Sequence, residues 1–118
     1  MRYADVLLML AEAKTMQGKV AEAIPLVKRI RDRAKLADIS MTAWTKDQMM
    51  TEIMHQRNVE FAREGLHFFD LRRWGTLESV IKTRPAGGYE LFTTKFSYYP
   101  IPQSELNNNP NMTQNAHW

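Results

Sequence analysis

The chain has 118 residues and a formal net charge of +3 at pH 7; 44% of its residues are hydrophobic and 25% are charged. This composition is that of one globular domain, or part of one, and it excludes a disordered chain and the strongly basic surface of a nucleic-acid binder. The longest apolar run, at 6–11, is far shorter than the ~18 residues of a membrane-spanning helix. The chain has no cysteine, which excludes disulfides and thiolate metal sites within it.

A helical hairpin is predicted over residues 1–36. Apolar residues recur at helical spacing over 3–17 and also occupy other faces, so this helix needs neighbours on more than one side. Gly18 favours a left-handed cap, and a second helical pattern follows over 20–34. Pro25 lacks an N–H, so we expect this helix to start late or to bend there. The spacing is also similar to a single tetratricopeptide unit, which cannot bury both of its faces alone.

A third helix is predicted to begin within the segment 45–75. Thr45 and Gln48 form a T-x-x-Q capping box at its start, and we expect it to end at about Glu64, before Gly65. Helical spacing predicts a core face on this helix made of Met50, Ile53, Met54, Arg57 and Phe61.

A short helix is predicted over 66–74, again ended by a glycine, Gly75. The composition then changes, because prolines and glycines interrupt any long helix and aromatic residues are interleaved with them. Residues 84–118 are therefore predicted to form an irregular tail, with at most a short strand at 96–99.

Two Glu-x-x-His pairs, Glu52 with His55 and Glu64 with His67, have the spacing that places two metal ligands on one helical face. Carboxylate-bridged metal sites of that kind draw on four helices, whereas these two pairs follow one another around a single helix end. We therefore predict no metal site.

Acidic pairs such as Glu60 with Glu64, or Glu60 with Asp70, are a possible carboxylate pair for glycoside hydrolysis. The chain contains no nucleophile elbow, phosphate-binding loop, zinc-protease motif or dinucleotide fingerprint. We therefore predict no catalytic residue and no cofactor. The charged residues are instead interpreted as an ion-pair network that closes the third helix onto the next one: Arg57, Glu60, Arg63, Glu64, Asp70, Arg72 and Arg73.

Aromatic side chains suggest sugar binding, because a flat apolar ring suits the C–H face of a pyranose. Trp44 stands just before a helix cap and is predicted to be exposed, and Tyr98 lies in the tail next to Tyr99 and Pro100. Trp44 and Tyr98 are therefore the candidate ligand-binding residues. The structural alternative is that Tyr98 holds the tail in place, and Trp74 is predicted to be a core residue.

Five linked blocks resemble the C-terminal portion of proteins of the SusD/RagB family in order, spacing and position. The blocks are RYADVLLMLAEA at 2–13, IRDRA at 30–34, EFAREG at 60–65, DLRRWG at 70–75, and YPIP at 99–102 with NP at 109–110 and QN at 114–115. The resemblance implies an all-α fold. It also implies that the intact protein is a surface-exposed outer-membrane lipoprotein of polysaccharide utilisation. Proteins of this family bind oligosaccharides or other nutrients. Such proteins pass their ligand to a TonB-dependent, SusC-like transporter and are not enzymes, and the resemblance implies no nucleic-acid partner.

The resemblance further implies that residues 1–118 are the C-terminal segment of a longer protein. The signal peptide, the lipid-bearing cysteine that attaches it to the membrane and most sugar contacts are then expected upstream of Met1, so the chain itself carries no targeting signal. Four matched residues are implied to be a structural motif that holds the last helices together: Asp70, Arg72, Arg73 and Trp74. The alternative is a free-standing helical-repeat module that binds a protein or peptide, and a small hydrolase that uses Glu60 and Asp70 is a third hypothesis.

Overall fold

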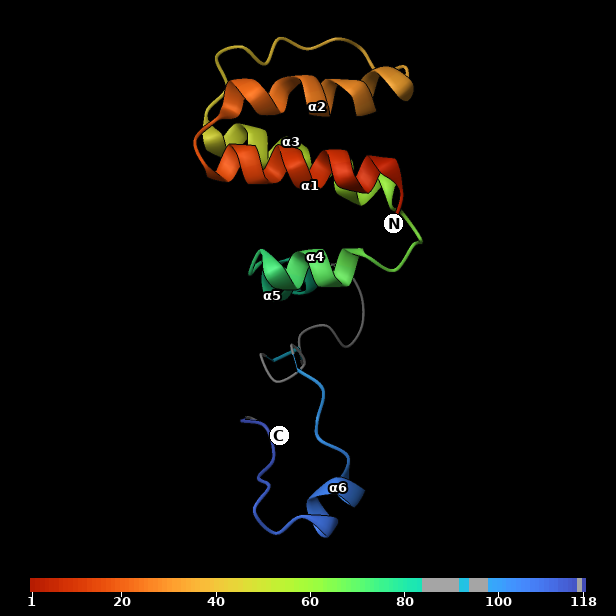
Figure 1. Cartoon of the computed structure of the whole chain (residues 1–118), viewed down its shortest axis with the longest axis vertical. Helices are drawn as coiled ribbons and strands as arrows, with labels where there is room; N and C mark the ends of the chain where they lie inside the picture. Colours follow the sequence, from red (N-terminus) through yellow and green to blue (C-terminus); the bar gives the residue numbers. More distant parts are fainter. Residues whose placement is uncertain (84–91, 94–97, 117) are drawn as a thin grey trace. The chain divides into compact units, whose positions relative to one another are not determined.

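The computed structural model describes residues 1–83, 92–93, 98–116 and 118, which fall into two units, Met1–His67 and Phe68–Trp118. Every regular element in these ranges is a helix, so the predicted all-α fold is confirmed (Figure 1). The helices are α1 (Tyr3–Met16), α2 (Val20–Arg33), α3 (Lys46–Glu60), α4 (His67–Arg73), α5 (Leu77–Lys82) and α6 (Gln103–Asn108). No helix of the described part has both the length and the apolar character that crossing a membrane requires.

Helices α1 and α2 form the predicted hairpin. Gly18, at a φ of +79°, ends α1 in a Schellman motif, because the amides of residues 18 and 19 bond back to the last turn. The two helices run antiparallel, since Lys14 bonds Glu22 beside the loop and Arg29 bonds Tyr3 at the far end. The tetratricopeptide-like character of this pair stays a prediction.

Of the two effects expected of Pro25, the late start of α2 is wrong, because the helix begins at Val20 and continues through Pro25. The bend near Pro25 stays a prediction. Pro25 lies in the second turn, where its ring removes only the one backbone hydrogen bond that its own N–H would have made. At the other end, Lys35 takes a left-handed φ of +56° and its amide bonds the carbonyl of Asp32 at 3.0 Å.

Helix α3 begins with the predicted capping box. The Thr45 amide donates to Gln48 Oε1 at 2.8 Å, and the Gln48 amide donates to Thr45 Oγ1 at 3.3 Å. The predicted end at about Glu64 is wrong, because the helix ends at Glu60. The carbonyl of Glu60 accepts a hydrogen bond from Arg2 Nη2 at 2.7 Å, so a side chain from the start of α1 takes the place of the next helical amide.

The core of the first unit lies where α3 packs against both α1 and α2. Fully buried Ala11 and Ala23 are small enough to let the helices approach closely. The two buried clusters are Ala11, Ala23, Val27, Met41, Met49 and Ile53, and Ala4, Leu7, Leu8, Ile30 and Phe61.

The predicted core face of α3 is correct at Ile53, Arg57 and Phe61. Met50 is half-buried and packs against the first core cluster, so the prediction is correct there in part. Met54 is only half-buried, and Met49 and Gln56 are further buried residues of α3 that were not predicted. Contact with two helices rather than one turns the buried face of α3 toward these positions.

In the second unit, α4 matches the predicted short helix. Gly75, at a φ of +72°, ends it in another Schellman motif. Helix α5 was not predicted, and neither was α6 inside the tail expected to be irregular. Both have six residues, too short for a clear hydrophobic period, and α6 starts directly after Pro102. Residues 96–97 of the strand proposed at 96–99 lie outside the described residues, and Tyr98 and Tyr99 are not in a strand.

Side-chain amides fold the tail back on itself. The Ile101 amide donates to Gln114 Oε1 at 2.8 Å, and Gln114 Nε2 donates to the Ile101 carbonyl at 3.0 Å. Asn115 Nδ2 donates to the carbonyl of Tyr99 at 2.7 Å. One glutamine side chain thus takes the place of a neighbouring strand and closes a loop that contains α6.

Candidate functional site

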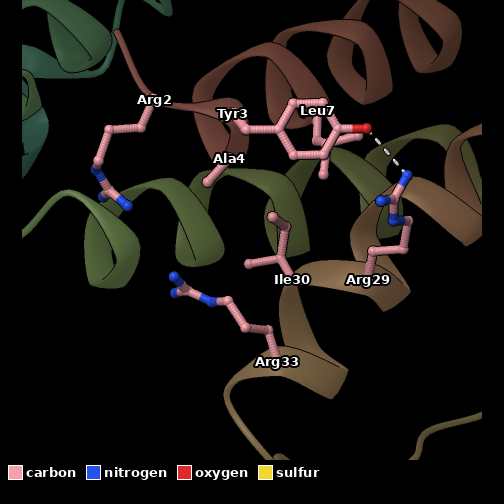
Figure 2. A pocket seen from close by; sticks show the side chains of 7 residues that line it. All are labelled: Arg2, Tyr3, Ala4, Leu7, Arg29, Ile30 and Arg33. Atoms are coloured by element: carbon pink, nitrogen blue, oxygen red, sulfur yellow. Dashed lines mark hydrogen bonds between the residues drawn. The ribbon is translucent and has the colours of Figure 1, made fainter.

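A hollow of about 320 Å³ opens between the beginning of α1 and the end of α2 (Figure 2). This volume lies at the lower end of the range of about 300–1,000 Å³ that is typical of small-molecule sites. The hairpin brings the two segments together, because its helices run antiparallel after a short loop. The residues lining the hollow are Arg2, Tyr3, Ala4, Leu7, Arg29, Ile30 and Arg33.

The hollow has an apolar floor and a polar edge. Buried Ala4, Leu7 and Ile30 form the floor, and all three belong to the second core cluster. At one edge, Arg29 Nη1 donates to the hydroxyl of Tyr3 at 3.1 Å, and its guanidinium carbon lies 5.3 Å from the centre of the Tyr3 ring. Tyr3 as a whole remains 62% exposed, so one aromatic residue is both held in place and accessible.

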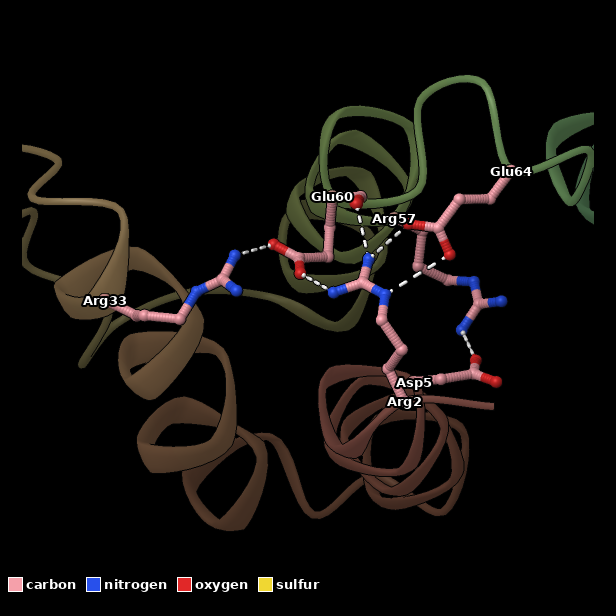
Figure 3. Close-up of polar contacts among 6 residues, drawn as sticks. All are labelled: Arg2, Asp5, Arg33, Arg57, Glu60 and Glu64. Carbon is pink, nitrogen blue, oxygen red and sulfur yellow. Dashed lines mark hydrogen bonds and ion pairs between the residues drawn. The ribbon is translucent and has the colours of Figure 1, made fainter.

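The other edge of the hollow joins an ion cluster at the end of α3 (Figure 3). Arg2 bonds Glu60 Oε1 and Glu64 Oε1, each at 2.7 Å, and Arg33 pairs with the second oxygen of Glu60. The hydrogen bond to Glu64, followed by that to Glu60, raises the pKa of Arg2 above its usual value. These bonds connect the ends of three helices.

A more deeply buried ion pair joins α3 to α1. Arg57 Nη1 lies 3.0 Å from Asp5 Oδ1, and the two side chains are 5% and 14% exposed. The guanidinium of Arg57 also lies 5.1 Å from the centre of the Phe61 ring. Within the described residues, no buried side-chain nitrogen or oxygen lacks a hydrogen-bond partner.

The predicted ion-pair network therefore has partners that the sequence interpretation did not include. The ion pairs described above for Arg57, Glu60 and Glu64 run to residues of α1 and α2. The closure of the third helix onto the next one stays a prediction.

The two candidate ligand-binding residues belong to different units and have different surroundings. Trp44 is half-buried and packs against the first core cluster, so its predicted exposure is wrong. Tyr98 is 57% exposed, its ring centre lies 4.7 Å from the guanidinium carbon of Arg72, and its carbonyl accepts from Trp118 Nε1 at 3.0 Å. Of the two, Tyr98 offers a ring face better placed for a ligand.

The four residues of the predicted structural motif make contacts around α4. Asp70 is 5% exposed and accepts from Arg73 Nε at 2.9 Å. The guanidinium of Arg73 lies 4.5 Å from the Trp74 ring centre, and Arg72 contacts Tyr98. Trp74 is half-buried, so it is less buried than the core residue that was predicted at this position. The role of this motif in holding the last helices together stays a prediction.

The Glu-x-x-His pairs do not form a metal site in the described part of the chain, where no three metal-binding side chains are grouped together. Glu52 instead pairs with Arg31 at 2.6 Å and accepts from Gln56 at 2.9 Å.

Sequence reasoning missed the hollow. A signal was nevertheless present, because a hairpin with a short loop must bring Tyr3 opposite the last turns of the second helix, where Arg29 and Arg33 stand.

The whole chain is similar to proteins of one known family. The model of the SusD family matches residues 1–118. SusD-like proteins P38 and P2 of Formosa agariphila are 32% and 31% identical; each match covers 98% of this chain, and 23% and 24% of those proteins. A SusD superfamily protein from Bacteroides vulgatus, known from its crystal structure, is 43% identical in sequence and gives a TM-score of 0.92. This match covers 100% of the present chain and 27% of the Bacteroides chain. The chain thus spans about a quarter of the length of these relatives.

Proposed function

Because this chain belongs to the SusD family, we propose that it is part of a non-catalytic protein that binds a glycan or another nutrient at the outer-membrane surface. The protein would deliver its ligand to a TonB-dependent, SusC-like transporter. The observation that carries this proposal is the family match over all 118 residues, because SusD-like proteins are carbohydrate-binding and non-catalytic.

Two observations support the view that the chain is a portion of a longer polypeptide. It spans only 23–27% of its relatives. Apolar side chains away from the hollow are also exposed along α1 in a number that a free-standing helix seldom tolerates: Val6, Met9, Leu10 and Met16. In this proposal the signal peptide and the lipid anchor precede Met1.

Sugar contacts within the chain are proposed at Tyr98 first and Trp44 second. The exposed ring of Tyr98 leaves a face for the C–H groups of a pyranose, and Arg72 beside it offers N–H donors for hydroxyl groups. Trp44 would need to leave part of its packing on the core to offer the same surface. Tyr98→Ala should therefore weaken glycan binding more than Trp44→Ala.

The fragment part of the proposal is tested by reading the DNA upstream of the Met1 codon in frame. We expect an open frame of several hundred codons that begins with a signal peptide and a cysteine lipidation site. A ribosome-binding site and a stop codon immediately upstream would contradict it and would favour the helical-repeat interaction module.

The function is tested in cells by deleting the gene and measuring both the binding of fluorescent polysaccharide to the surface and growth on that polysaccharide. We expect both to fall, and both to return with a plasmid copy. Delivery predicts in addition that the protein co-purifies with a TonB-dependent transporter from detergent-solubilised outer membranes. Unchanged surface binding for every polysaccharide that supports growth would overturn the proposal.

A further inference from the structure

The hollow between α1 and α2 carries more positive charge than its neighbouring carboxylates neutralise. Three arginines line it, Arg2, Arg29 and Arg33, and the ion cluster beside it contributes two carboxylates, Glu60 and Glu64. Three positive and two negative charges leave a net charge of +1. Both carboxylates are bound by Arg2 or Arg33. Arg29 has no carboxylate partner anywhere in the described ranges, so the uncompensated charge lies on this side chain.

We propose that this hollow is a subsite for an acidic sugar residue, whose carboxylate is bound by Arg29 and whose ring lies on the apolar floor. This inference rests on the proposed glycan-binding function and specifies the class of glycan.

Arg29 is suited to hold a carboxylate because it is positioned before a ligand arrives. The ring and hydroxyl of Tyr3 fix its guanidinium through one stacking contact and one hydrogen bond at 3.1 Å. A guanidinium has five N–H donors, so this bond leaves several free for a bidentate interaction with a planar carboxylate. Prior fixation lowers the conformational entropy lost on binding.

The floor suits the other part of such a ligand. A pyranose has faces made of C–H groups, and buried Ala4, Leu7 and Ile30 offer a matching apolar surface below the exposed edge of Tyr3 (Figure 2). A neutral sugar would gain this surface but not the charge-assisted bonds to Arg29. The subsite therefore discriminates by charge, and acidic residues should bind more tightly than neutral ones of the same size.

The test is isothermal titration of the complete polypeptide, which the proposed function expects to extend beyond these 118 residues, with trigalacturonic acid, with neutral cellotriose, and with sodium acetate at the same carboxylate concentration. We expect trigalacturonic acid to bind most tightly and its affinity to fall as salt is added. Arg29→Gln should raise its Kd about tenfold or more, because a charge-assisted hydrogen bond is lost. Arg29→Lys, which keeps the charge without the planar fork, should have an intermediate Kd.

Lys19→Gln is the matched control, because it removes an exposed cation at the other end of the hairpin and should leave the Kd unchanged. NMR spectra of the same complete polypeptide, labelled with ¹⁵N in its arginines, locate the ligand, and the Arg29 Nε–H signal should shift on titration. Far-UV circular dichroism confirms that the variants fold.

Each of the following three results would overturn the proposed acidic subsite. If cellotriose binds as tightly as trigalacturonic acid and Arg29→Gln has no effect, the glycan-binding function stands and the acidic subsite is wrong. If acetate shifts the Arg29 signal at the same carboxylate concentration, the hollow holds an adventitious anion only. If trigalacturonic acid fails to bind, the inference is wrong, whereas the proposed function is decided separately by the cell-surface measurement.

Discussion

Replacing Asp5 by Asn tests whether the buried ion pair between α1 and α3 stabilises the first unit. Asn has the shape of Asp but no charge, so the substitution leaves the Arg57 cation, 5% exposed, without its negatively charged partner 3.0 Å away (Figure 3). Water cannot readily replace that partner, because the side chain of Asp5 is itself only 14% exposed.

The magnitude follows from this burial. Removing one member of a buried ion pair typically costs about 3–5 kcal/mol. Arg57 keeps its contact with the Phe61 ring, so we expect a loss near the lower limit, about 3 kcal/mol. For a chain of this length, an entropy of unfolding of about 2.1 cal/mol/K per residue converts this loss to a fall in Tm of about 12 °C. Urea denaturation and thermal melting, both followed by circular dichroism at 222 nm, measure the two quantities.

Asp32→Asn is the matched control, because it makes the same chemical change at an exposed carboxylate that lies 3.8 Å from Lys28. Surface pairs of this kind contribute little to stability, so its urea midpoint should equal that of the wild type. Asp5 also lies in the first turn of α1, where its charge favours the helix dipole. A double-mutant cycle with Arg57→Met separates the two effects. A coupling free energy near zero, or equal midpoints for Asp5→Asn and Asp32→Asn, would refute the reasoning.

Three further predictions concern the first unit. Ile53→Ala removes a fully buried side chain and should lower the free energy of unfolding by about 2–5 kcal/mol in urea titrations; a loss below 1 kcal/mol would contradict the core assignment. Lys35 has a left-handed φ of +56°, which glycine adopts without strain. Lys35→Gly should therefore raise the free energy of unfolding by about 0.5–1 kcal/mol, whereas Lys35→Ala should not raise it. The hydrogen bond from Lys28 lowers the pKa of Asp38. The pair therefore stabilises the fold at pH values above the ordinary carboxyl pKa, and this stabilisation is lost as the pH falls through the lowered pKa. The difference in urea midpoint between wild type and Asp38→Asn should therefore shrink below about pH 4; a constant difference from pH 6 to 2.5 would contradict this.

Features that depend on near neighbours in the chain were predictable from the sequence. The capping box at Thr45 and Gln48, and the helix ends at Gly18 and Gly75, each need only a few consecutive residues of the right type. Their backbone hydrogen bonds form as the patterns predict. The all-α fold follows from the same local signals combined with helical periodicity.

Features that depend on distant contacts were not predictable in the same way. The carbonyl of Glu60, at the end of α3, accepts a hydrogen bond from Arg2, a residue 58 positions earlier, and this contact has no local signal in the sequence. The burial of Met49 and Gln56 depends on α3 touching two helices at once. The short hairpin loop predicts which end of α2 lies beside Tyr3, whereas the hollow itself depends on how the side chains around it pack. Helix α6 was missed because Pro102 precedes it and proline usually marks a loop.

Glycan binding without turnover is tested most directly by native affinity electrophoresis in gels cast with a panel of neutral and acidic polysaccharides, using the complete polypeptide that we propose extends beyond this chain. Product analysis of the same mixtures by chromatography detects any cleavage. We predict that at least one polysaccharide retards the protein and that none is shortened. Equal mobility in every gel would contradict binding, and release of shorter glycans at a rate that falls when Glu60 or Asp70 is replaced would contradict the absence of catalysis.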